Sequence, residues 1–160
     1  AKERFVDELK ESGLDYTVIR PNGFFSDMKE VLHMAQKGKV YLFGDGKHQG
    51  NPIHGADLAE FIVEKMESTV TDLEVGGPDV LTQNQIAELA FEAIGKKEKI
   101  THIPSWIKNL TLFFVRRFSS QKTYGPIEFF MTVMTRDMIA PAYGRQGLAD
   151  FFKKTNLIYK

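Results

Sequence analysis

The chain has 160 residues, enough for one domain with a hydrophobic core, and its 21 basic residues balance its 21 acidic residues. Because nucleic-acid-binding proteins usually carry a basic excess, this balance argues against a nucleic-acid partner. The absence of cysteine excludes disulfides, thiolate nucleophiles and cysteine-ligated zinc. The sequence shows neither an apolar run long enough to span a bilayer nor a signal-peptide pattern, so we expect a cytoplasmic protein without a membrane partner.

The first quarter of the sequence predicts a helix, a short strand and a second helix. Apolar residues recur at roughly helical spacing over residues 2–10, and Gly13 is suited to the left-handed conformation that ends such a helix. The β-favouring residues 16–19 predict a strand. Pro21 ends this strand because proline offers no N–H to a sheet. Ser26 is the predicted N-cap of the second helix.

The middle of the chain continues the alternation. The sequence VYLFG at 40–44 predicts a strand, and GDGKHQG at 44–50 predicts a hairpin-like turn. This turn is not a phosphate-binding loop, because its glycines do not match G-x-G-x-x-G and Pro52 follows where a helix would begin. The sequence NPIHGADLAEFIVEKM at 51–66 predicts a short strand that leads into a helix.

The second half begins with a strand at 73–80 that ends in a glycine turn. Thr82 then caps a helix that Gly95 ends, and a further strand follows at 98–104. The remaining predicted elements are helices at 105–118, 127–139 and 146–154. Strands alternating with helices predict an α/β architecture with parallel pairing.

The segment after the first strand is the leading candidate for a binding site. Open α/β sheets bind ligands beyond the carboxyl ends of their strands, which is where Asn22 and Gly23 lie. Asn22 offers hydrogen-bond donors and acceptors, Gly23 permits close approach of the backbone, and Phe24 with Phe25 is suited to cover a flat ring. The competing interpretation is a tight loop whose proline and glycine serve geometry and whose phenylalanines lie in the core.

Other polar residues have two interpretations each. Lys2, on the helix before the first strand, is suited to hold a ribose hydroxyl or to lower the pKa of a nearby phenol, or it is a solvated surface residue. His54 and Asp57 form either an acid/base pair or, the favoured reading, a structural imidazole bonded to backbone beside a helix N-terminus. The four histidines are scattered along the chain, so we expect no metal site.

The sequence KERFVDELKESGLDYTVIRPNGFFSDM, residues 2–28, resembles the atypical short-chain dehydrogenase/reductase group, which includes NmrA-like and epimerase-like NAD(P)-binding proteins. Residues 12–21 match the S-G-L-D-Y/W-T-x-x-R-P strand of that family. Lys2 precedes Arg20 by the same spacing as the family's lysine precedes its arginine. Segments 51–66 and 74–104 resemble later elements of the same family.

This resemblance implies the C-terminal part of a Rossmann-like doubly wound sheet together with the helical substrate-binding portion. Residues 1–104 would end the NAD(P)-binding domain and 105–160 would form a helical tail. The cofactor would be NAD or NADP, acting on a small-molecule substrate. The residues that the resemblance assigns to cofactor binding are Pro21, Asn22, Gly23 and Phe24, and it assigns a catalytic role to Lys2.

The family's glycine-rich phosphate loop and the first half of its sheet are missing from the sequence. We therefore expect a fragment of an NAD(P)-dependent oxidoreductase or epimerase-like protein, which lacks its N-terminal Rossmann half and binds no dinucleotide tightly alone. One alternative is a non-catalytic NAD(P)-binding redox sensor. Another is a cofactor-free domain that forms a homodimer through the apolar residues 106–134.

Overall fold

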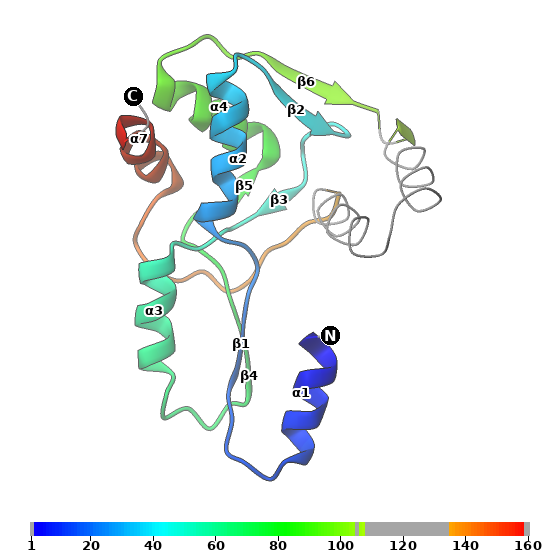
Figure 1. Cartoon of the computed structure of the whole chain (residues 1–160), viewed down its shortest axis with the longest axis vertical. Helices are drawn as coiled ribbons and strands as arrows, with labels where there is room; N and C mark the ends of the chain where they lie inside the picture. The colour runs from blue at the N-terminus through cyan, green and yellow to red at the C-terminus, as the bar shows by residue number, and fades with distance from the viewer. Residues whose placement is uncertain (1, 105, 108–134, 159–160) are drawn as a thin grey trace.

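The computed structural model describes residues 2–104, 106–107 and 135–158 of the chain (Figure 1). Helices alternate with strands over most of this length, which confirms the predicted α/β class. The described elements are α1 (Lys2–Glu11), β1 (Val18–Pro21), α2 (Phe25–Gln36), β2 (Val40–Phe43), β3 (Gln49–Gly50), α3 (Gly55–Glu64), β4 (Asp72–Val75), β5 (Leu81–Thr82), α4 (Gln83–Ile94), β6 (Ile100–Ile103) and α7 (Leu148–Ile158).

One part of the molecule is built on the parallel pair β1–β4, which lies between α1 and α3 in the lower half of Figure 1. Ile19 and Leu73 are paired in register and pack, with the buried Val75, against Phe61 of α3. Side chains alternate between the two faces of a strand, so the intervening residues face the other side. There Arg20 and its partners carry charge rather than an apolar core.

The other part is built on the parallel pair β2–β6, in register from Val40↔Ile100 to Phe43↔Ile103. Helices α2, α4 and α7 pack against one another, and α2 and α4 also pack against β2; their side chains form the larger of the two apolar clusters among the described residues. Phe91, Phe152 and Leu32 are fully buried in it. Helix α7 confirms the helix predicted at 146–154, with its bounds shifted to 148–158. The predicted division of the chain at residue 104 stays a prediction.

The predicted hairpin-like turn at 44–50 is wrong. Strand β3 at its end does not return along β2 but pairs antiparallel with β5, Gln49 opposite Thr82. Gly44 and Gly46 have φ values of 75° and 69°, which let the chain turn away from β2. The backbone oxygen of Gly46 then accepts a hydrogen bond of 3.0 Å from the N–H of Asn84, at the start of α4.

Local predictions about helix ends had mixed outcomes. Thr82 caps α4 in a capping box with Gln85, and Gly95 ends that helix with φ 66°, as predicted. Ser26 is not the cap of α2: Phe24 occupies the N-cap position without a side-chain hydrogen bond. The N–H of Phe25 donates instead to the backbone oxygen of Ile53, at 3.1 Å, so a distant segment satisfies the helix start.

Two further predictions need correction. The first strand covers residues 18–21 rather than 16–19, and Pro21 is its last residue, paired with Val75. The helix predicted at 127–139 does not extend through the described residues 135–139, where Met138 instead forms a bridge with Gly50. Two predictions lie outside the described residues except at 106–107. They are the helix at 105–118 and the homodimer formed through the apolar residues 106–134.

Within the described ranges, no helix combines the length and apolar character that crossing a membrane requires.

Candidate functional site

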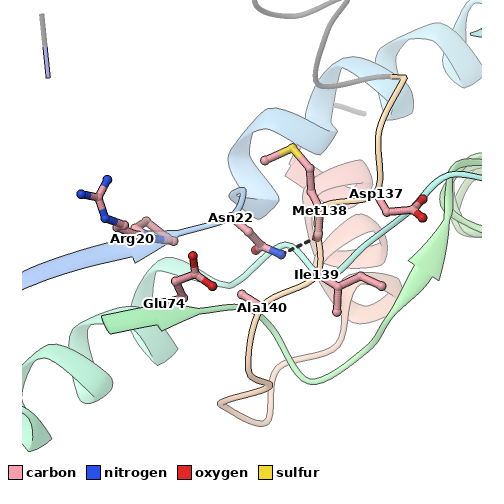
Figure 2. A pocket seen from close by; sticks show the side chains of 8 residues that line it. Arg20, Asn22, Glu74, Asp137, Met138, Ile139 and Ala140 are labelled. Carbon is pink, nitrogen blue, oxygen red and sulfur yellow. Dashed lines mark hydrogen bonds between the residues drawn. The ribbon is translucent and has the colours of Figure 1, made fainter. Parts of the chain in front are cut away.

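The candidate site lies where β1 and β4 end. The two strands are parallel, so Pro21 and Val75 finish at the same edge of their sheet. A pocket of about 270 Å³ opens at this edge (Figure 2). Its lining consists of Arg20, Pro21, Asn22, Glu74, Asp137, Met138, Ile139 and Ala140. The position agrees with the rule that open α/β sheets bind ligands beyond the carboxyl ends of their strands.

One wall of the pocket is an extended stretch that we call the crossing segment, residues 137–142, which runs over the ends of the strands. The N–H of Met138 donates to the backbone oxygen of Gln49 at 2.7 Å. At the other end of the segment, the N–H of Gly76 donates to the oxygen of Pro141 at 2.9 Å. Backbone hydrogen bonds at both ends thus hold the crossing segment against the sheet.

Asn51 joins the crossing segment to the turn after β4. Its side chain is 1% exposed. Its Nδ2 donates to the backbone oxygens of Gly77 and Ala140, at 3.0 and 2.9 Å, and its Oδ1 accepts from the N–H of Ala140 at 3.0 Å. A buried amide whose donors and acceptor are all used holds three chain segments in one geometry.

Asn22, at the tip of β1, contacts both Asn51 and the crossing segment. Its Nδ2 donates to Oδ1 of Asn51 at 2.5 Å and to the backbone oxygen of Met138 at 2.6 Å. Figure 2 shows its side chain directed at the main chain of Met138. Its Oδ1 is closed to solvent and accepts no hydrogen bond from any described residue. Leaving such a group unpaired costs about 1–3 kcal/mol.

The close approach of these segments requires glycine after β4. A Cβ on Gly77 would lie 2.0 Å from the backbone oxygen of Pro52, and one on Gly76 would lie 2.3 Å from Nδ2 of Asn51. Gly23 differs, because a Cβ there would meet only ordinary contact at 3.8 Å from Pro52. The described residues therefore do not require glycine at position 23, in contrast to positions 76 and 77.

Arg20 links the pocket to α1. Its Nη1 and Nη2 donate to the two carboxylate oxygens of Glu3, at 2.7 and 3.2 Å, and its Nε donates to Asp72 at 2.8 Å. The hydrogen bond and charge of Arg20 lower the pKa of Glu3, and those of Glu3 and Asp72 raise the pKa of Arg20. With three of its five N–H groups bonded to two carboxylates, Arg20 ties the first turn of α1 to the sheet.

Asp137 lies at the opposite rim of the pocket. Its Oδ1 accepts from the N–H of Gln49 at 2.9 Å and lies 3.2 Å from Nδ1 of His48. The backbone hydrogen bond of Gln49, followed by that of His48, lowers the pKa of Asp137. The carboxylate is therefore ionised at neutral pH. No cluster of metal-ligating side chains occurs among the described residues.

The structure places the predicted site residues unequally. Pro21 and Asn22 line the pocket, and Gly23 follows them. Phe24 is half-buried and packs against the apolar cluster of Ile53 and its neighbours. Lys2 is exposed at the start of α1, without a hydrogen bond or ion pair to the rest of the described chain. The cofactor-binding and catalytic roles of these residues stay predictions.

His54 and Asp57 do not pair with each other. The buried Asp57 accepts hydrogen bonds through Oδ2 from the N–H groups of Arg145 and Gln146, at 3.2 and 3.0 Å. Nδ1 of His54 accepts from the N–H of Ala56 at 3.2 Å and caps α3. Both side chains therefore have the structural role that the sequence favoured.

Neither Asn51 nor the crossing segment was predicted to belong to the site. Asn51 stands before a proline and is typical of a turn, while residues 137–139 lie in a predicted helix. The paired Gly76 and Gly77 were the one available sign, because two adjacent glycines after a strand mark a place where other backbone comes close.

No family model matches the chain. It is 30% identical over 183 residues to the chloroplastic divinyl chlorophyllide a 8-vinyl-reductase of Cucumis sativus, covering 96% of this chain and 44% of that protein. The chain therefore spans less than half the length of this curated relative.

Solved structures share the fold at low sequence identity. A crystal structure of isoflavone reductase superposes with a TM-score of 0.68 and 18% identity, covering 96% of this chain and 57% of that one. The GDP-mannoheptose C4 reductase of Campylobacter jejuni, with NADP bound, superposes with a TM-score of 0.55 and 14% identity, covering 92% and 50%. Other neighbours were solved with NAD. The chain thus has the Rossmann-like α/β fold of NAD(P)-binding reductases and epimerases, and its curated relative is a reductase.

Proposed function

We propose that this chain forms the nicotinamide side and the substrate pocket of an NAD(P)-dependent oxidoreductase of the reductase or epimerase-like kind. The observation that carries the proposal is the pocket at the carboxyl ends of β1 and β4, the edge at which this fold binds its ligands. The similarity to a reductase supports the oxidoreductase part of the proposal. The small-molecule substrate would enter the pocket beside the nicotinamide ring.

The residues present fit the nicotinamide end of the cofactor better than its phosphates. Asn22 offers a neutral acceptor, Oδ1, to which no described residue donates a hydrogen bond. Arg20 already donates three hydrogen bonds to two carboxylates, whose negative charges oppose the approach of a phosphate. A pyrophosphate needs a glycine-rich turn before a helix N-terminus, and the sequence contains no G-x-G-x-x-G.

We therefore propose that the phosphate-binding part of the cleft comes from a βα unit that this sequence does not contain. When bound, the cofactor supplies the hydride chemistry. Pro21, Asn22 and Gly23 would orient its nicotinamide ring. Lys2 would hold a ribose hydroxyl from the start of α1, a helix that Arg20 ties to the sheet through Glu3.

The curated relative and the family resemblance suggest different substrates. The relative's name specifies a vinyl group of a chlorophyllide and a chloroplast, whereas the family resemblance implies a small carbonyl or sugar-like compound. The cytoplasmic location stays a prediction. A non-catalytic NAD(P) sensor would use the same cleft, so it differs from the oxidoreductase only in turnover.

The proposal is tested by titrating the ¹⁵N-labelled chain with NADH and NADPH and following backbone amide signals by NMR. We expect weak binding, with shifts concentrated at residues 20–24 and 137–140. The Asn22→Ala variant should reduce these shifts, and Asn84→Ala, which removes a bridging asparagine in the turn at α4, should not. Shifts confined to other surfaces, or none at millimolar cofactor, would contradict the proposal.

A further inference from the structure

The hydrogen bonds around the pocket fix which end of each asparagine amide is the donor and which is the acceptor. From this polarity we infer that Oδ1 of Asn22 is a specificity-determining acceptor for the carboxamide N–H of nicotinamide, and that Asn51 is the residue that positions it. The inference rests on the proposed function, which places nicotinamide in this pocket. It adds the polarity of the contact, the chemical group selected and the role of Asn51.

The orientation of Asn51 follows from backbone groups whose polarity is never in doubt. The carbonyl oxygens of Gly77 and Ala140 only accept, so the atom between them must be the Nδ2 donor. The N–H of Ala140 only donates, so the atom that it contacts must be Oδ1. Turning the amide over would set its oxygen against two carbonyls and its NH₂ against an N–H.

The orientation of Asn22 follows from that of Asn51. The same atom of Asn22 contacts Oδ1 of Asn51 and the carbonyl oxygen of Met138, both of which are acceptors. This atom is therefore Nδ2, and its two hydrogens are both used. Oδ1 of Asn22 is left as a fixed acceptor, and the side chain has no freedom to turn it into a donor.

The pocket itself does not supply a donor for this oxygen. Glu74 and Asp137 present carboxylates, which only accept, and no described residue, Arg20 included, donates to this oxygen. Since Oδ1 is closed to solvent in this structure, a ligand reaches it only after a local rearrangement around Asn22, whose amide also contacts the crossing segment at Met138. Binding should therefore also move the amide signals of Met138 and Ala140.

A fixed neutral acceptor selects a neutral donor. A ketone, a carboxylate and a phosphate offer no hydrogen, so each would leave Oδ1 unpaired and bring a second acceptor against it. The carboxamide of nicotinamide carries two N–H hydrogens. Sites built to bond a ligand N–H reject an analogue that lacks it, because the protein group is then left without its partner.

The test compares two mononucleotides that differ in this one group, nicotinamide mononucleotide and its 3-acetylpyridine analogue, in which a methyl ketone replaces the carboxamide. Affinities for the 160-residue chain come from NMR titration, with the Asn22 side-chain NH₂ signals as a local probe. We expect the acetylpyridine analogue to bind roughly fivefold to tenfold more weakly, as loss of one hydrogen bond to a buried acceptor implies.

Variants separate the two roles. Asn22→Ala should bind both mononucleotides with similar affinity, while the matched control Asn84→Ala keeps the wild-type preference. Asn51→Asp retains an oxygen that accepts from Nδ2 of Asn22, so it should keep the preference even with reduced stability. Asn51→Leu removes that acceptor and should abolish the preference, with dispersed amide signals showing that the variant is folded.

The outcomes are distinguishable. Equal binding of the two mononucleotides by the wild-type chain, with shifts at the pocket, overturns the acceptor role of Asn22 and leaves the proposed function standing. If Asn22→Ala still prefers nicotinamide mononucleotide, the acceptor role of Asn22 is overturned as well. If Asn51→Leu still prefers it, the positioning role of Asn51 is overturned. No shift at the pocket with either compound at millimolar concentration overturns the proposed function along with the inference.

Discussion

The two parallel strand pairs of this molecule are held in different ways. The β2–β6 part has a core of fully buried aromatic and aliphatic side chains contributed by three helices. In the β1–β4 part, α1 has one buried residue, Val6, and Arg20 ties that helix to the sheet with ion pairs. Apolar burial thus joins three helices in the β2–β6 part, whereas in the β1–β4 part it covers the α3 side of the sheet and leaves a charged, accessible face beside the pocket.

This difference separates stability from recognition. The pocket lies where the charged part ends, and its walls are fixed by hydrogen bonds between side chains and backbone rather than by apolar packing. Such bonds set direction as well as distance, which an apolar contact does not. A site that must distinguish an amide from a ketone needs this directionality.

The largest effect is expected in the apolar core. Phe91→Ala removes a ring with no exposed surface and should lower the free energy of unfolding by about 3–5 kcal/mol. The matched control is Phe5→Ala on α1, whose side chain is 64% exposed and whose loss should cost under about 0.5 kcal/mol. Urea unfolding followed by circular dichroism measures both, and similar losses would refute the contrast between the two parts.

An intermediate effect is expected where the segments cross. Gly77→Ala places a Cβ against the backbone oxygen of Pro52, which cannot move independently, and should destabilise the chain by about 1–3 kcal/mol. Its signature is a loss of amide protection at Ala140 and Gly77. Gly55→Ala, at a position with no atom within 4 Å of the new Cβ, should leave protection and stability near wild type. Full protection in Gly77→Ala would show that the crossing tolerates a side chain.

The smallest effect concerns pH and the docking of α1. Arg20 lowers the pKa of Glu3 in the folded state below its ordinary value of 4.5. The stabilisation of the folded chain by the Glu3–Arg20 ion pair is therefore complete at pH values above 4.5, and it disappears as the pH falls through the lowered pKa of Glu3 in the folded state. NMR signals of Val6 should report loosening of α1 in this acid range, before the signals of Phe91 change.

The matched variant for this prediction is Glu3→Gln, which removes the titrating group. It should loosen α1 modestly at neutral pH and abolish the acid-dependent step at Val6. Simultaneous changes at Val6 and Phe91 in the wild-type chain would mean that the two parts do not respond separately to acid.

The sequence predicted the features that depend on neighbours in the chain. Thr82 and Gln85 lie one helical turn apart, so their capping box was readable, as was Gly95 at the end of the same helix. The strand before Asn22 and its place at a sheet edge were also predictable, although its boundaries shifted by two residues. Short-range hydrogen bonds and side-chain periodicity determine these features with little help from the rest of the molecule.

The tertiary structure decided the rest. Ser26 failed as a cap because Ile53 satisfies the first turn of α2, and the turn at 44–50 was not a hairpin because β3 pairs with β5. The role of Asn51 depends on Gly77 and Ala140, which lie 26 and 89 positions away along the chain. Composition and spacing predicted the α/β class and pointed to the sheet edge that carries the pocket. The polarity of the amides there arises only when distant backbone groups meet, because a hydrogen bond takes its direction from both partners.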